Sequence, residues 1–299
     1  MPGPEPFPIK YCQPIVRPLY FISGLHAFVC EEIVKLAIAG KGGVGKTTLA
    51  SLLAMVYSAE GKRVIAIDAN PDTNLASALG IPAEVARDIV PIVELEDLIE
   101  ERTGAKPGTA SPFFKLNPKV DDIPDRFSVK KGNVRLMVMG TVKGGGAGCV
   151  CPESALLRGL LSHLLLDRSE VVIMDMDAGL EHLGRGTAQG VDAFIIVVEP
   201  GKRSFQTAEA VRRLAKDLGV GQCYVVGSKT HNDADRRFII DHLPGFEVLG
   251  FINYNPKIAE ADRLGVGVFE FAQEAVEEVK KIKENLEASI SKKAKEGKY

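Results

Sequence analysis

Nine consecutive residues, 40–48, have the types and spacing that bind phosphate. A glycine, four residues and then Gly-Lys-Thr form the phosphate-loop pattern. Its glycines let backbone N–H groups point at phosphate oxygens, Lys46 supplies a positive charge, and Thr47 supplies a hydroxyl for magnesium. The sequence therefore predicts that a nucleoside triphosphate is bound by Gly40, Gly42, Gly43, Val44, Gly45, Lys46, Thr47 and Thr48.

The sequence on either side of this loop agrees with the pattern. Residues 34–39 form an apolar segment of strand length, and residues 49–57 continue with the composition of a helix. A strand, a glycine loop and a helix place the bound anion at a helix N-terminus, where negative charge is favoured. Lys41, directly after the first glycine, is an additional lysine that an ordinary phosphate loop does not need.

Carboxylates follow two further apolar segments, as magnesium-dependent hydrolysis requires. Mg²⁺ takes oxygen ligands, and one or two carboxylates near the phosphates are sufficient. We expect one of Asp68 and Asp72 to position the attacking water and the other to hold the metal through water, unless these residues only cap helices. Asp175, which ends an apolar run, is the Walker B candidate, and Gly179 in the same segment is expected at the nucleotide.

The residues expected near the base favour adenine. Guanine-reading proteins with a phosphate loop usually have Asn-Lys-x-Asp, whereas residues 228–231 of this chain are Ser-Lys-Thr-His and lack the final acid. Ser228, Lys229 and Asn255 are predicted to contact the nucleoside.

One pair of cysteines has the spacing of a metal site. Residues two apart in an extended backbone face the same side, so the sulfurs of Cys149 and Cys151 can approach one metal, unless their closeness is accidental. Two thiolates fill half of a four-coordinate site, and a symmetric dimer would complete a tetrahedral zinc site or a square-planar nickel site. Cys223 lies in an apolar segment and is predicted to be a small core residue.

A mostly parallel sheet must position these residues. Apolar segments alternate with helical stretches, which is typical of an α/β P-loop NTPase with a doubly wound sheet flanked by helices. The carboxyl ends of the strands then place Lys46, Asp68, Asp175 and Glu199 along one edge. Strands are expected at 34–39, 62–67, 134–139, 171–174, 194–198, 224–226 and 248–252, the longer helices at 83–90, 93–102, 153–166, 206–218 and 269–290, and a surface excursion at 106–133.

Composition narrows the class of protein further. With 45% hydrophobic residues, 25% charged residues and a formal net charge of -2, the chain has no bulk attraction to nucleic acid or to an anionic membrane. Five cysteines, an odd number, fit a reducing compartment, so the cytoplasm is the expected location.

Residues 34–290 are expected to form a single ATPase domain. Residues 1–33 begin with a proline-rich stretch and lack the pattern of a secretory signal, so we interpret them as an N-terminal extension, disordered or the product of a mis-assigned start. Residues 291–299 are expected to be a charged tail. The polar face of the last helix mixes both signs of charge, which favours packing on the sheet over stable membrane association.

The phosphate loop with its second lysine, Lys41, resembles that of the deviant Walker A ATPases. This class includes MinD, ParA, the arsenite-pump ATPases and the nitrogenase iron protein, and its members act as nucleotide-gated dimers. The resemblance implies an ATP-dependent homodimer in which Lys41 reaches the phosphates of the partner. Arginine fingers supplied in trans, which act in a comparable way, raise rates about 10³- to 10⁵-fold.

Within this class, residues 35–287 resemble the CooC-type nickel-insertion ATPases of carbon monoxide dehydrogenase maturation. The resembling segments are 34–48, 116–121, 149–151, 172–183, 185–188 and 199–200. The resemblance implies that Cys149 and Cys151 bind Ni²⁺ (or Zn²⁺) at the dimer interface, and that metal binding is coupled to hydrolysis of ATP with Mg²⁺. It further implies that apo carbon monoxide dehydrogenase, or the related acetyl-CoA synthase, receives the metal.

Three residues depart from the pattern of these relatives. Asp177 stands where they commonly have glycine, Ser228 where they often have asparagine, and Asn253 where they often have proline. The extra carboxylate of Asp177 is expected to alter magnesium binding or the motion of its segment. The other two changes affect the expected adenine contacts.

Two other classes of function stay open on the sequence. A positioning ATPase like MinD or ParA would bind membrane or DNA with ATP, and would sediment with liposomes or DNA. An iron–sulfur electron donor like the nitrogenase iron protein would need a cysteine soon after Asp175, but the sequence has no cysteine between Cys151 and Cys223.

Overall fold

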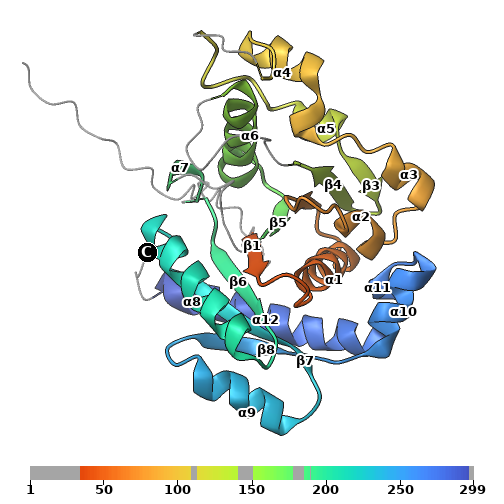
Figure 1. Ribbon diagram of the computed structural model, residues 1–299, viewed down its shortest axis with the longest axis vertical. Coiled ribbons are helices and arrows are strands. Elements are labelled where there is room, and N and C mark those ends of the chain that lie inside the picture. Colours follow the sequence, from red (N-terminus) through yellow and green to blue (C-terminus); the bar gives the residue numbers. More distant parts are fainter. Residues whose placement is uncertain (1–33, 109–112, 141–150, 178–184, 189, 296–299) are drawn as a thin grey trace, which may run out of the picture. The chain divides into compact units, whose positions relative to one another are not determined.

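The computed structural model describes residues 34–108, 113–140, 151–177, 185–188 and 190–295. These residues contain an eight-stranded sheet in the order β3-β4-β2-β5-β1-β6-β7-β8 (Figure 1). Neighbouring strands are parallel except β3, which is antiparallel to β4. The strands are β1 (Lys35–Gly40), β2 (Val64–Asp68), β3 (Val129–Lys131), β4 (Val134–Val138), β5 (Val171–Asp175), β6 (Ala193–Val198), β7 (Cys223–Thr230) and β8 (Glu247–Asn253).

Helices alternate with these strands, which confirms the predicted α/β P-loop NTPase fold. The α-helices are α1 (Lys46–Ala59), α2 (Leu75–Ala78), α3 (Ala83–Arg87), α4 (Glu96–Thr103), α5 (Ile123–Arg126), α6 (Pro152–Ser162), α7 (Arg185–Ala188), α8 (Lys202–Asp217), α9 (Asp233–His242), α10 (Pro256–Leu264), α11 (Val268–Phe271) and α12 (Gln273–Lys295). Ile92–Glu94 forms the 3₁₀-helix η1, and His163–Asp167 forms the π-helical turn η2.

The sheet separates two hydrophobic cores because alternate residues of each strand face opposite sides. In β1, Leu36 and Ile38 pack into a core that includes buried residues of α1 and α12. Ala37 and Ala39 face the other core, which includes buried residues of α6 and α8. Strands buried on both faces are continuous apolar runs, and this is the pattern from which the parallel sheet was predicted.

Some elements are longer than the sequence predicted, and two lie in a segment that was predicted to be a loop. Strand β7 continues to Thr230 because its polar end pairs with β8, so Ser228 and Lys229 lie within the strand and not after it. The predicted excursion at 106–133 contains α5 and β3. Helix α12 continues to Lys295, beyond the predicted end at residue 290.

Two stretches that were each predicted to be a single helix are divided into two elements in the structure. The stretch 93–102 is divided at Leu95, whose φ of -81° and ψ of 74° separate η1 from α4. The stretch 153–166 is α6 followed by the π-helical turn η2. Periodicity alone does not distinguish such a division from one continuous helix.

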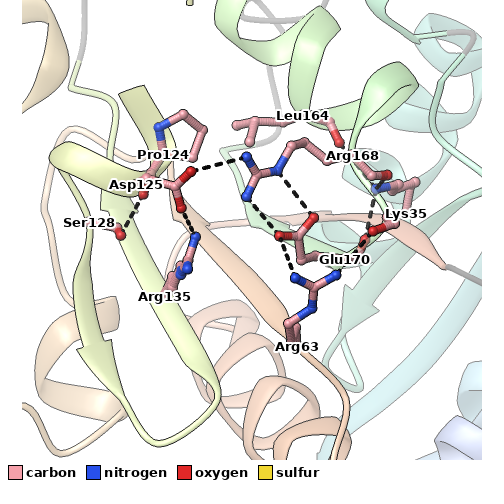
Figure 2. A network of polar contacts seen from close by, with 10 residues as sticks. Lys35, Arg63, Pro124, Asp125, Ser128, Arg135, Leu164, Arg168 and Glu170 are labelled. Atoms are coloured by element: carbon pink, nitrogen blue, oxygen red, sulfur yellow. Dashed lines mark hydrogen bonds and ion pairs between the residues drawn. The ribbon is translucent and has the colours of Figure 1, made fainter. Parts of the chain in front are cut away.

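Buried charges join the amino ends of β1 and β5 (Figure 2). Figure 2 shows the ammonium of Lys35, which donates to the carbonyl oxygens of Leu164, Arg168 and Glu170 at 3.1, 2.9 and 2.7 Å. Lys35 is 6% exposed, and burial lowers its pKa to about 8, although Glu170 and Asp192 act to raise it. Lys35 thereby connects the start of β1 to the chain between α6 and β5.

The same network contains an ion pair that directly precedes β5. The guanidinium of Arg168 binds both carboxylate oxygens of Glu170, at 2.7 and 3.1 Å, and Arg63 lies 3.9 Å from one of them. Burial acts to raise the pKa of Glu170, but Arg168 and Arg63 outweigh it and keep the pKa below its usual value. Asp125 extends the network by pairing with Arg168 and Arg135.

Among the described helices, none is long and apolar enough to cross a membrane.

Candidate functional site

The phosphate loop connects β1 to α1 along a path that favours glycine at three positions. Gly40 has a φ of +149°, and a Cβ there would lie 2.5 Å from the carbonyl oxygen of Val197 in β6. Gly43 and Gly45 have φ values of +77° and +100°, and Gly45 directly precedes α1. A side chain at Gly42 or Gly43 would meet nothing within 4 Å, so these backbone groups face open space. The loop is therefore curled and accessible, as phosphate binding requires.

A cavity of about 620 Å³ opens in front of this loop. On one side it is lined by Gly42, Gly43, Gly45, Lys46, Thr47 and Thr48, which were all predicted to bind nucleotide. Further lining residues are Asn70, Pro71, Asp72, Asn74, Asp177, Ser228, Lys229, Asn253, Tyr254 and Asn255, together with apolar residues such as Ile258, Val266 and Val268. The polar lining residues suit the phosphates of a nucleotide, and the apolar ones suit its base.

Lys46 and Thr47 begin α1 and point at carboxylates from the end of β5 and the residues after it. The Nζ atom of Lys46 lies 3.6 Å from a carboxylate oxygen of Asp177 and 3.4 Å from the carbonyl oxygen of Lys41. The hydroxyl of Thr47 donates to Asp175 at 2.6 Å. The predicted phosphate lysine, magnesium hydroxyl and Walker B aspartate therefore lie together.

Asp175 is buried and poorly compensated. Burial raises its pKa to about 6, and the neighbouring Asp68 acts in the same direction, while Thr47, Asn70 and Lys46 act to lower it. Asp68 and Asp175 are paired in register on adjacent parallel strands, which explains their closeness. Such a pair of carboxylates is expensive to ionise without a cation.

The oxygen atoms near Thr47 fit a magnesium ion. Among the described residues, one carboxylate oxygen of Asp175 and the amide oxygen of Asn70 are buried without a hydrogen-bond partner. Both oxygens are hard donors of the kind that Mg²⁺ selects, and a hydroxyl, Thr47, lies beside them. Asn70 was not predicted, although its place two residues after Asp68 at a strand end was a usable signal.

The two aspartates predicted to act in hydrolysis have different surroundings. The carboxylate of Asp68 accepts hydrogen bonds from the backbone N–H groups of Asn70 and Leu75, at 3.1 and 3.0 Å. Asp68 thus holds the turn into α2, which is the capping alternative, and burial raises its pKa despite these bonds. Asp72 is exposed and lines the cavity, so it is the better placed of the two to contact water near a phosphate.

At the base end, the predicted residues line the cavity but differ in how free their side chains are. Lys229, at a φ of +56°, crosses the loop and donates to the carbonyl oxygen of Gly43 at 2.5 Å. The side chain of Asn255 accepts from the N–H of Lys257 and donates to Glu274. Ser228 is buried beside Gly45. Asn255 therefore caps α10, and its side chain is occupied.

Asn253, one of the departures from the resembling family, has a structural role. Its side-chain oxygen accepts from Thr230 and Arg236, and its amide nitrogen donates to Glu278. This amide links β7, α9 and α12 through hydrogen bonds, which a proline side chain cannot form because it has no polar atom.

The thiol pair lies at the boundary of the described chain. Cys149 and Gly179 fall outside the described residues. Cys151 is half-buried at the N-cap of α6, and its sulfur donates to the hydroxyl of Ser154 at 3.1 Å. Within the ranges that the structure describes, no three His, Cys, Asp or Glu side chains are grouped to hold a metal. Cys223 is half-buried at the start of β7, and burial raises its pKa to about 11, as expected of an unreactive core thiol.

Lys41 pairs with a carboxylate and does not line the cavity. Its ammonium lies 3.1 Å from a carboxylate oxygen of Glu199, directly after β6, and neither residue is among the described residues that line the cavity. The sequence placed Glu199 on this edge of the sheet, but it gave no sign of the pairing because the two residues are 158 positions apart.

Comparison with known proteins identifies the family. The model of the CobQ/CobB/MinD/ParA nucleotide binding domain matches residues 35–268. The carbon monoxide dehydrogenase accessory protein CooC of Rhodospirillum rubrum is 48% identical over 80% of this chain and 90% of its own length. An uncharacterized ATP-binding protein of Methanocaldococcus jannaschii is 47% identical over 83% and 96%, respectively.

The fold has solved counterparts as well. The MinD cell division protein of Aquifex aeolicus superposes with a TM-score of 0.60 at 21% identity, over 85% of this chain and 97% of that one. At this identity the likeness concerns the fold alone. Together with the phosphate loop and its carboxylates, the matches establish that the chain is an ATPase that belongs to the CobQ/CobB/MinD/ParA nucleotide-binding family, as a CooC-type member of the deviant Walker A ATPases.

Proposed function

We propose that this ATPase is an accessory protein of carbon monoxide dehydrogenase, or of acetyl-CoA synthase, which delivers nickel as a nucleotide-gated homodimer. The observation that carries the proposal is the 48% identity to the CooC protein of Rhodospirillum rubrum over 90% of that protein. The position of Cys151 relative to the nucleotide site supports it.

The described residues of the nucleotide site have different roles in ATP binding and hydrolysis. Lys46 and the backbone of Gly42 and Gly43 bind the phosphates of ATP. Thr47 and Asp175 would hold magnesium, which would neutralise phosphate charge. Asp72 orients the attacking water from the open side of the cavity.

Lys41 acts in the dimer. Because its ammonium lies outside the cavity of its own chain, it is available to the phosphates of a partner. ATP then favours the paired state, since the second lysine is supplied only by pairing.

In the metal half, α6 connects the thiols to the nucleotide site. Cys151 is the N-cap of α6, and α6 leads through η2 into β5, which ends at Asp175. Because α6 and β5 follow each other in opposite directions, the N-terminus of α6 lies toward the same sheet edge as Asp175. The N-terminus of a helix also favours the negative charge of thiolates. Cys149 and Cys151 of two chains supply four sulfurs to one ion.

Anaerobic nickel titration of the purified protein, with and without ATP, tests the metal half. We expect about one nickel per dimer in the wild type and loss of binding in Cys151→Ser, because two thiolates per chain are required. Cys223→Ser is the matched control, since this thiol is remote in sequence and partly buried at the start of β7. Undiminished nickel binding in Cys151→Ser would refute the metal site.

Delivery needs a second readout. Nickel-loaded protein is mixed with apo carbon monoxide dehydrogenase in the presence of ATP, and recovered carbon monoxide oxidation is followed. Activation by the wild type and by Cys223→Ser, but not by Cys151→Ser, is the expected outcome. Equal activation by all three proteins would leave this chain without a role in delivery.

A further inference from the structure

The carboxylate of Glu199 is the contact that fixes the second lysine of the phosphate loop. The Nζ atom of Lys41 lies 3.1 Å from Oε1 of Glu199, and the two side chains are 38% and 30% exposed. The pair is therefore accessible to a competing anion but is shielded in part from water.

The backbone on both sides of this pair is held firmly. Gly40 and Val197 are partners in the β1–β6 register, and Gly40 approaches the carbonyl oxygen of Val197 so closely that a Cβ would not fit. The N–H of Glu199 donates to the hydroxyl of Ser204, which is buried in the first turn of α8. The lysine and the carboxylate thus leave adjacent strands at the same level, and their pairing follows from the sheet.

Lys41 has different surroundings from the neighbouring residues of the phosphate loop. Gly42, Gly43 and Lys46 line the cavity, whereas Lys41 is not among the described residues that do so. An ammonium beside a carboxylate at 3.1 Å is largely neutralised. A phosphate group can attract Lys41 only by displacing Glu199. In the dimer of the proposed function, this phosphate belongs to the ATP of the second chain.

We propose that Glu199 is a positioning residue for Lys41, which holds the lysine on its own chain until the ATP of a partner chain takes it. This inference rests on the dimer of the proposed function. Glu199 opposes pairing in the absence of ATP, because each chain must give up its Lys41–Glu199 contact when two chains close. The carboxylate therefore keeps chains without ATP apart, and bound ATP compensates for the contact that is lost on closure.

Glu199→Gln removes the negative charge and keeps the shape of the side chain. Partly exposed ion pairs of this kind correspond to about 2- to 5-fold in an equilibrium constant. Because a symmetric dimer releases two pairs, we expect the dissociation constant of the dimer with a non-hydrolysable ATP analogue to fall about 4- to 25-fold. Analytical ultracentrifugation over a series of protein concentrations measures this dissociation constant. The ATPase rate at low protein concentration is expected to rise as the constant falls.

Three further variants separate positioning from a general effect. In the Lys41→Ala background, Glu199→Gln is expected to change nothing, because its action passes through Lys41. Glu199→Asp, which is shorter by one methylene, is expected to give an intermediate constant. Glu209→Gln is the matched control, since Glu209 pairs with Arg212 on α8 at similar exposure.

The outcomes distinguish this inference from the function on which it rests. Tighter ATP-dependent pairing in Glu199→Gln, lost in the Lys41→Ala background, supports it. Weaker pairing in Glu199→Gln, or the same shift with and without Lys41, overturns it. If the wild-type chain fails to pair with ATP at all, then the dimer of the proposed function itself is wrong.

Discussion

Strand β5 has a carboxylate at each end, and the surroundings of the two carboxylates have opposite effects. Glu170, just before the strand, is bound by both nitrogens of an arginine fork and has a lowered pKa. Asp175, at the end of the strand, has one hydroxyl donor and a buried carboxylate neighbour, and its pKa is raised to about 6. The two carboxylates are only five positions apart in sequence.

This difference in pKa indicates a structural role for the edge at Glu170 and a ligand-binding role for the edge at Asp175. Around Glu170, acids and bases satisfy one another, so the network joins β1 to η2 and to the start of β5 without any ligand (Figure 2). Around Asp175, oxygen atoms remain unsatisfied among the described residues, so the site is completed by a cation and a nucleotide. Charge that is balanced internally stabilises the fold, and charge that is not balanced marks a binding site.

Lys46→Met makes the most severe test of the carboxyl edge. Because Lys46 supplies the positive charge beside the phosphates, we expect kcat/KM for ATP to fall about 10²- to 10³-fold, as for the loss of one preorganised donor. The free energy of unfolding should change little, since the ion pair of this lysine within the described part of the chain is with the exposed Asp177. Phosphate release and urea unfolding measure the two quantities.

Lys35→Met is the matched substitution at the other edge. Three buried carbonyl oxygens lose their donor, so the free energy of unfolding is expected to fall by about 3 kcal/mol. The affinity of the folded protein for ATP should be retained. If Lys35→Met weakened ATP binding as much as Lys46→Met, the separation of the two edges would be wrong.

The pH dependence of stability should have opposite sign at the two ends of β5. Folded Asp175 has a pKa raised from 3.8 to about 6, so its stabilising contribution is complete below pH 3.8 and is lost as pH rises through 6. The loss is about 3 kcal/mol at most. The lowered pKa of Glu170 gives stability that is present above its normal pKa and is lost as pH falls.

Urea unfolding from pH 2 to pH 8 checks this contrast. Relative to the wild type, Asp175→Asn should abolish the loss of stability on going from pH 4 to above 6, and Glu170→Gln should abolish part of the loss on acidification. Magnesium and ATP should suppress the Asp175 effect in the wild type, because a bound cation favours the ionised carboxylate. The same pH profile in both variants would contradict the comparison.

Asp177→Asn gives the smallest expected effect. Asp177 lies 3.6 Å from Lys46 and is 53% exposed, so nucleotide must displace it from the lysine. Removing its charge should tighten ATP binding about 2- to 5-fold, the range of an exposed ion pair. Fluorescent nucleotide titration measures this affinity, with Asp233→Asn on α9 as a control for the general loss of one exposed, paired acid. Weaker binding would instead assign Asp177 to the magnesium site.

The features that could be predicted from sequence are those with a local cause. The glycine spacing predicted the phosphate loop, and the apolar runs before Asp68 and Asp175 predicted two strand ends on one edge of the sheet. The Lys41–Glu199 and Lys35–Glu170 contacts could not be predicted, because they join residues more than 130 positions apart. Likewise, Asn255 was predicted to contact the nucleoside, but its cap of α10 depends on where that helix begins.

The central place of β1 in the sheet also determines when the nucleotide site can form during synthesis. Although β1 is the first strand described, its neighbours are β5 and β6, and the N–H of Lys35 is bound by Asp192, 157 residues later. The ribosome must therefore release most of the chain before the phosphate loop acquires its walls. Contacts of such long sequence separation form slowly. A nascent chain that ends before β6 has the complete phosphate-loop sequence but lacks a site to bind ATP, so nucleotide cannot assist its folding until late.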